Sequence, residues 1–176
     1  MKLLESIQTL LKKPTVKNKY YDIRLDPIFS EEAHQNHFLK KGWCKFDQLL
    51  SKDELSAFEN TFNEISGLSE FTNEKSFINT GCHSSASLKE KTEKTINQVM
   101  PQVFSRIFID DKVQMQTGGS FAIKPPSKES HLDVHQDGSF IDEEKDYSAM
   151  LWFPLVDVEN DEGVISVIAG SHLWGN

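Results

Sequence analysis

The chain of 176 residues is long enough for one domain with a buried core, and its 38% hydrophobic and 10% aromatic content fits a folded globular protein. A formal net charge of −8 argues against a nucleic-acid-binding surface. The two cysteines, Cys44 and Cys82, are too few and too far apart for a disulfide framework or a zinc cluster, which favours a reducing, cytoplasmic setting.

The first half of the sequence is predicted to be mostly helical. The N-terminal "MKLLESIQTLLKK" has no apolar run long enough for a secretory signal, and its leucines and isoleucine follow the spacing of a short amphipathic helix. No stretch approaches the roughly 18 apolar residues of a membrane span. A second short helix is expected over residues 30–41, ended by Gly42, and the "WCKF" at 43–46 is typical of a short strand.

Two capping patterns predict two longer helices. Ser51 and Glu54 have the spacing of a capping box, in which the hydroxyl and the carboxylate satisfy free N–H groups of the first turn. Ser87 and Glu90 repeat the pattern, and Pro101 is expected to kink or break the helix that follows. The apolar stripes of these helices comprise Leu55, Phe58, Phe62 and Ile65 in the first, and Ile96, Val99, Met100, Val103 and Phe104 in the second.

The second half changes to strand composition. Strands are predicted within residues 113–126, 148–158 and 163–170, with a Gly-Gly bend, a Pro-Pro stop and the turn "ENDEG" between them. Helices followed by strands predict an α+β fold. We expect one domain over the whole chain, with a helical half at about 1–110 and a β half at about 111–176.

The stretch "HLDVHQDGSF" at 131–140 contains two overlapping His-x-Asp triplets. On a strand, residues two apart point to the same face, so a histidine nitrogen and an aspartate oxygen can converge on one metal ion. With a second histidine, such a pair forms the facial triad of non-haem Fe(II) oxygenases, although composition alone does not select iron over zinc or manganese. A solvated loop with a surface histidine is the ordinary alternative, and spacing alone does not separate the two triplets.

From about residue 30 onward the chain resembles the phytanoyl-CoA dioxygenase family of Fe(II)/2-oxoglutarate-dependent oxygenases. The segments that carry the resemblance are "FLKKGWCKFDQLLSKDELSAFENTFNEI" (38–65), "KPP" (124–126), "HQDGSF" (135–140) and "GVISVIAGSH" (163–172). The resemblance implies a double-stranded β-helix core, which is a cupin-like jelly-roll, with the N-terminal helices packed on it.

The resemblance also implies which residues form the site. In the family, the loop from the Lys-Pro-Pro segment to the metal-binding histidine is about as long as the loop from Lys124 to His135, and a glutamine inside the triplet is preferred. By this resemblance, His135 and Asp137 are the catalytic iron ligands. Gln136, Trp152 and Ser120 are implied to contact 2-oxoglutarate, the serine by position only. For the other triplet, His131 and Asp133, a solvated approach loop and a substrate contact at the mouth of the site both stay open. Lys124 and His172 are expected to be structural.

The implied activity is hydroxylation of a small organic substrate by Fe(II), O₂ and 2-oxoglutarate as co-substrate, and the aspartate at position 137 favours hydroxylation over halogenation. The family also uses a second histidine ligand and an arginine that pairs with 2-oxoglutarate. Arg24 and Arg106 lie in the helical half and match neither position. We therefore expect a fragment of a longer oxygenase, with the β-fold incomplete at its C-terminus.

Two alternatives remain open from the sequence. One is a catalytically inactive barrel that binds a metal or small ligand, and the other is a half domain completed by another chain. Neither a nucleic acid nor a membrane is expected as a partner. The identity of the small-molecule substrate and the oligomeric state stay undetermined by the residues.

Overall fold

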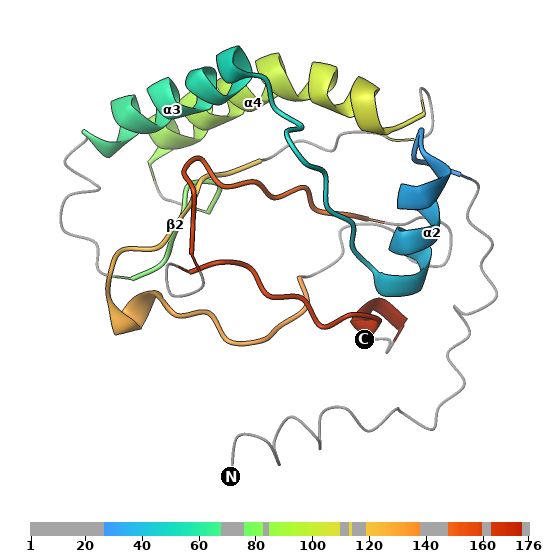
Figure 1. Cartoon of the computed structure of the whole chain (residues 1–176). Coiled ribbons are helices and arrows are strands. Elements are labelled where there is room, and N and C mark those ends of the chain that lie inside the picture. Colours follow the sequence, from blue (N-terminus) through green and yellow to red (C-terminus); the bar gives the residue numbers. More distant parts are fainter. Residues whose placement is uncertain are drawn as a thin grey trace, which may run out of the picture. The chain divides into compact units, whose positions relative to one another are not determined.

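The computed structural model describes residues 27–67, 76–82, 85–109, 113, 119–137, 148–159 and 163–173. In chain order its elements are α2 (Glu32–Lys41), α3 (Lys52–Ser66), β1 (Ile78–Asn79), α4 (Ala86–Ile107), β2 (Ala122–Ile123) and the 3-10 turns η2 (Lys128–Ser130) and η3 (Ser171–Leu173) (Figure 1). The chain divides into two compact units, one drawn from residues 1–45 and 167–176 and the other from 46–166. That one domain spans the chain stays a prediction, and the N-terminal helix predicted at 1–13 lies outside the described residues.

In the smaller unit, helix α2 ends where the sequence predicted. Gly42 has a φ of 78°, a left-handed conformation that glycine adopts at little cost, and its N–H donates to the carbonyl of Phe38. A Cβ at position 42 would also collide with the ring of His172. The Nε2 of His172 donates to the carbonyl of Leu39 over 3.1 Å, so this histidine has the structural role expected of it.

In the larger unit, the capping box at the start of α3 is confirmed. The Ser51 hydroxyl accepts from the N–H of Glu54, and the Glu54 carboxylate accepts from the N–H of Ser51 over 2.8 Å. The guanidinium of Arg106, near the end of α4, pairs with Glu54 and donates to the carbonyl of Leu49. These contacts join the beginning of α3 to the end of α4.

We expect stability to depend on Glu54 at acidic pH. The hydrogen bond from the Ser51 backbone, and then the contacts of Arg106, hold the pKa of the Glu54 carboxyl below its ordinary value of 4.5. The stabilisation is therefore fully present above about pH 4.5 and is lost as the pH falls through the lowered pKa. Urea unfolding at several pH values should show that the free energy of unfolding falls less at acidic pH in Glu54→Gln than in the wild type. Equal losses in both proteins would contradict this prediction.

Helix α4 departs from the sequence prediction at its start and in its middle. It begins at Ala86 with Ser85 as N-cap, so the capping box predicted at Ser87 and Glu90 is wrong: Ser87 already lies inside the first turn. Pro101 does not break the helix, which continues to Ile107. Pro101 lies on the exposed side, where water can satisfy the Asn97 carbonyl that loses its partner.

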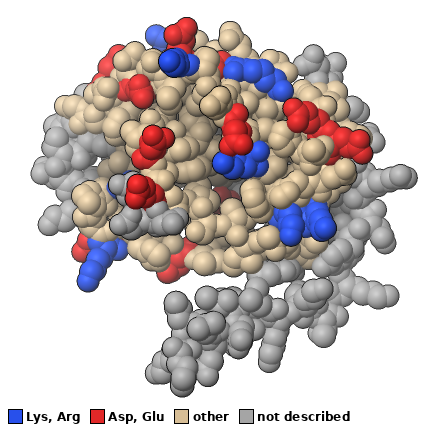
Figure 2. Space-filling view, viewed as in Figure 1, with Lys and Arg blue, Asp and Glu red and all other residues tan. Residues whose placement is uncertain are grey.

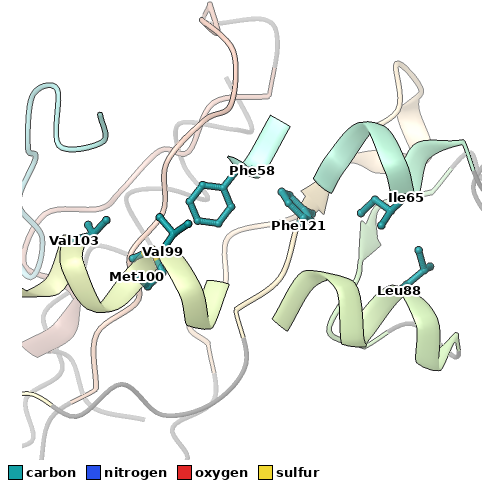
Figure 3. Packing of buried hydrophobic residues seen from close by; sticks show 7 residues of the cluster. All are labelled: Phe58, Ile65, Leu88, Val99, Met100, Val103 and Phe121. Atoms are coloured by element: carbon teal, nitrogen blue, oxygen red, sulfur yellow. The ribbon is translucent and has the colours of Figure 1, made fainter. Parts of the chain in front are cut away.

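The core of the larger unit lies between α3 and α4. The side chains in Figure 3 that form it are Phe58, Ile65, Leu88, Val99, Met100, Val103 and Phe121. The Phe58 ring, 2% exposed, meets the rings of Phe121 and Phe153 at centroid distances of 6.4 and 5.1 Å. Apart from Leu55, the residues of both predicted stripes belong to this core or pack against it, and the helical part of the α+β prediction is confirmed.

Among the described residues, the hydrogen-bonded sheet is one antiparallel pair of short strands. Ile78 of β1 pairs with Ile123 of β2, and Asn79 pairs with Ala122. Thr80, which is fully buried, extends the pairing because its hydroxyl accepts from the N–H of Phe121 over 2.9 Å. Of the strand predicted over residues 113–126, the described residues form a strand at Ala122–Ile123, and residues 114–118 lie outside the described part of the chain.

The strands predicted at 43–46, 148–158 and 163–170 are wrong for the described residues, which have no strand assignment there. Exposure in the segment 150–156 nevertheless alternates with the period of two that a strand would give. The side chains packed against the core are Leu151, Phe153 and Leu155, whereas the exposed ones include Met150, Trp152 and Val156. The alternation is a local property, but a strand also needs a neighbouring backbone to bond with.

On the face drawn in Figure 2, Lys and Arg are interspersed with Asp and Glu among the described residues. That face therefore presents no continuous basic stripe of the kind that follows a nucleic-acid backbone. Cys44 and Cys82 are both free, and burial raises the pKa of the Cys44 thiol to about 11. None of the helices in the described part of the chain is long and apolar enough to cross a bilayer.

Candidate metal centre

The segment that carries both His-x-Asp triplets, residues 131–137, is called the arm below. It follows strand β2 after the turn "KPPSKES". The Lys124 ammonium group donates to the carbonyl of Gly163 over 3.3 Å, so Lys124 contributes a structural contact at the start of the turn. The turn closes with η2, and the arm begins at His131. All seven residues of the arm are exposed, and none of them belongs to a strand.

His135 and Asp137 face each other. The Nε2 atom of His135 lies 3.5 Å from the Oδ1 atom of Asp137, and the two side chains are 54% and 60% exposed. Two ligand atoms that are each ~2.1 Å from one metal ion lie no more than ~4.2 Å apart. The pair therefore fits a shared ion, and an imidazole nitrogen with a carboxylate oxygen is a donor set that suits Fe(II).

The second triplet has the same internal distance, with His131 Nε2 3.4 Å from Asp133 Oδ1. The distance between histidine and aspartate therefore does not separate the two candidates. The two pairs differ in exposure, because the His131 and Asp133 side chains are 76% and 99% exposed and are thus more exposed than those of His135 and Asp137. A pair in full contact with water binds a metal less well than one that is partly screened.

A hydrogen bond to the other ring nitrogen distinguishes His135. Its Nδ1 lies 2.7 Å from the backbone carbonyl of Asp133, and because a carbonyl only accepts, Nδ1 carries the proton. A neutral imidazole then has its free lone pair on Nε2, the atom that faces Asp137. This is the arrangement that orients metal-binding histidines. Among the described residues, the ring of His131 has no such bond to a carbonyl.

The predicted 2-oxoglutarate contacts lie on three separate segments. Gln136 is on the arm and exposed, Ser120 is exposed just before β2, and Trp152 is 43% exposed within the alternating segment 150–156. Among the described residues, neither Ser120 nor Trp152 forms a hydrogen bond or ring contact with His135 or Asp137. Their role at the co-substrate stays a prediction.

Within the described ranges, no group of three His, Cys, Asp or Glu side chains could hold a metal ion. That His135 and Asp137 are metal ligands stays a prediction, and the described residues add no third ligand to this pair. Arg106 has the structural contacts described above with Glu54 and Leu49.

One contact at this site was not predicted from the sequence: the backbone carbonyl of Asp133, because the sequence pattern drew attention to its carboxylate instead. The turn before the arm also has a contact that was not predicted, since the Ser130 side chain is 7% exposed and bonded to the carbonyls of Pro125 and Ser127. A serine three residues after another serine, directly behind Pro-Pro, was the available signal, since serine hydroxyls commonly bond the carbonyl three residues back.

The family comparison agrees with the motifs of the arm and of the helical half. The model of the family described as phytanoyl-CoA dioxygenase (PhyH) matches residues 38–176. The match includes α3, α4, β2, the turn and the arm. No curated protein and no solved structure matches the chain. Because the match covers well over half of the sequence, the chain belongs to the phytanoyl-CoA dioxygenase family.

Proposed function

We propose that this chain is part of an Fe(II)- and 2-oxoglutarate-dependent oxygenase that hydroxylates a small organic substrate, with His135 and Asp137 as two of the metal ligands. The family match supports the reaction class. The observation that carries the ligand assignment is the bond from His135 Nδ1 to the Asp133 carbonyl, which leaves Nε2 free 3.5 Å from the Asp137 carboxylate.

Each residue has a distinct part in this proposal. Bound Fe(II), with 2-oxoglutarate and O₂, supplies the oxidation of a substrate C–H bond. Asp137 contributes a negative charge that favours a cation, and His135 contributes a neutral nitrogen donor. The amide of Gln136 and the hydroxyl of Ser120 can bond carboxylate oxygens of the co-substrate. The exposed ring of Trp152 is an apolar surface against which the co-substrate can pack.

We also propose that the β half forms part of a jelly-roll. The support is the alternation in 150–156, where one set of side chains packs on the helical core and the other set is exposed and largely apolar. A segment that is apolar on both faces is typical of a strand with a covered layer on each side. Trp152 lies on the face away from the helices, where a co-substrate could reach it.

Metal dependence tests the proposal directly. With Mn(II) as an inert probe for Fe(II), the full chain should bind 2-oxoglutarate in titration calorimetry, and chelation by EDTA should abolish that binding. With Fe(II) and O₂, 2-oxoglutarate should be converted to succinate, at a rate at least about tenfold above the metal-free protein. Binding of 2-oxoglutarate that is unaffected by EDTA would contradict the assigned metal centre.

A second candidate function is a barrel that binds a metal without turnover. It is favoured because the described residues provide two predicted ligands and not three. The described residues bring histidine and aspartate together in pairs and form no group of three ligands, whereas the oxygenase triad needs a further histidine. Calorimetry that shows metal binding, combined with no affinity for 2-oxoglutarate, would favour this alternative over the oxygenase. A chain completed by a partner would instead show a larger mass in light scattering than one copy.

A further inference from the structure

We infer that Gly81, at the turn that follows β1, is a positioning residue for Ser120. The absence of a side chain at position 81 leaves the room in which the Ser120 hydroxyl can meet a ligand. The inference rests on the proposed function, in which this hydroxyl bonds a carboxylate oxygen of 2-oxoglutarate. It adds to that function a residue from the chain segment that lies opposite Ser120.

The register of the two short strands brings Gly81 next to Ser120. The strands are antiparallel and pair Asn79 with Ala122, so the same register places Gly81 opposite Ser120. A Cβ at Gly81 would lie 3.3 Å from the Cβ of Ser120 and 3.9 Å from its Oγ. Opposite Cβ atoms of an antiparallel pair are ordinarily about 4.5–5.5 Å apart. The two backbones are therefore closer here than a side chain at position 81 allows.

The backbone conformation at Gly81 does not itself require glycine, because Gly81 is not among the glycines with a left-handed φ. What an alanine would meet is other side chains: besides Ser120, the Oδ1 of Asn79 would lie 3.2 Å from the new Cβ. This Oδ1 accepts from the N–H of Gly81 over 2.9 Å. Gly81 and Ser120 are both exposed, so a carboxylate can approach the hydroxyl from the side that a methyl group would cover.

Ser120 has little room to retreat, because the residues on both sides of it are held in place. The N–H of Phe121 donates to the hydroxyl of the buried Thr80 over 2.9 Å, and its carbonyl accepts from the Thr80 N–H over 3.1 Å. On the other side, a Cβ at Gly119 would lie 2.5 Å from the Cδ1 of Ile96, so the backbone there packs directly against α4. A methyl group opposite Ser120 would therefore both displace its side chain and cover one side of its hydroxyl.

Titration calorimetry of the full chain loaded with Mn(II) measures the Kd for 2-oxoglutarate. Gly81→Ala should bind 2-oxoglutarate about tenfold more weakly than the wild type, because a hydrogen bond to a charged group is lost or distorted. Its Kd for Mn(II), measured by electron paramagnetic resonance, should match the wild type. Gly67→Ala is the matched control: Gly67 has a φ of −77°, and a Cβ there would lie at least 3.8 Å from its nearest neighbours. It should leave both Kd values unchanged.

A double-mutant cycle shows whether Gly81 acts through the Ser120 hydroxyl. Ser120→Ala removes this hydroxyl and should weaken 2-oxoglutarate binding about tenfold by itself. Gly81→Ala added to Ser120→Ala should then cost no more than about a further twofold. If the two effects multiply in the double variant, Gly81 acts independently of Ser120 and the positioning role is overturned.

The outcomes separate this inference from the proposed function. Wild-type affinity for 2-oxoglutarate in Gly81→Ala, alongside weaker binding in Ser120→Ala, overturns the role of Gly81 and leaves the proposed function standing. Absence of 2-oxoglutarate binding by the wild type overturns both. If thermal unfolding shows that Gly81→Ala does not fold, Asn79→Ala decides, because it removes the acceptor that holds the Gly81 N–H. Binding about threefold weaker with the Ser120 hydroxyl present, and unchanged without it, supports the inference, whereas equal effects in both backgrounds overturn it.

Discussion

His135→Ala is expected to reduce metal-dependent succinate formation and Mn(II) affinity at least about a hundredfold, whereas His131→Ala should leave both near the wild-type values. The substitution removes a nitrogen ligand whose Nε2 faces Asp137 and whose Nδ1 is held by the Asp133 carbonyl. The two histidines are four residues apart on one exposed segment, so His131→Ala is a close control for effects on folding.

Asp133→Ala sharpens the same test. The contact that holds His135 comes from the backbone carbonyl of Asp133, and its carboxylate is 99% exposed. Removal of the carboxylate should therefore leave metal affinity within about threefold of the wild type, while Asp137→Ala should lose it as His135→Ala does. If Asp133→Ala lost metal affinity and Asp137→Ala kept it, the ligands would be His131 and Asp133.

Phe58→Ala is expected to reduce the free energy of unfolding by about 3–5 kcal/mol. The Phe58 side chain is 2% exposed and contacts the rings of Phe121 and Phe153, so its removal leaves a cavity where α3 meets the rest of the core. Urea unfolding followed by circular dichroism measures the loss.

The control for this change is Met150→Ala. Met150 is 75% exposed, and its truncation should alter the free energy of unfolding by no more than about 0.5 kcal/mol. Phe58→Leu, which refills part of the cavity, should recover roughly half of the loss. A cost below about 1 kcal/mol for Phe58→Ala would mean that this core does not stabilise the larger unit.

The elements that the sequence predicted well are those with a local cause. Helix α2 ends at Gly42 because the left-handed conformation is a property of that residue. The capping box at Ser51 and Glu54 needs only four consecutive residues. The second capping pattern failed for an equally local reason: the spacing of Ser87 and Glu90 also occurs inside a helix that has already begun at Ala86.

The elements that the sequence predicted poorly depend on distant partners. Composition predicted a strand at 148–158; exposure alternates there over 150–156, but the hydrogen bonds that define a strand come from another part of the chain. Pro101 was expected to kink or break α4, and it does not break the helix, because its exposed position in the folded unit allows α4 to continue. Which side of a helix faces water is decided by tertiary packing.

For the candidate site, the sequence by itself determined the residue types: two His-x-Asp triplets behind a Pro-Pro turn, in a chain of the phytanoyl-CoA dioxygenase family. Only the tertiary structure supplied the contacts that distinguish one triplet from the other. The bond from His135 to the Asp133 carbonyl follows from the path of the backbone. A sequence pattern specifies which atoms can bind a metal, whereas the folded backbone decides which of them are held in place to do so.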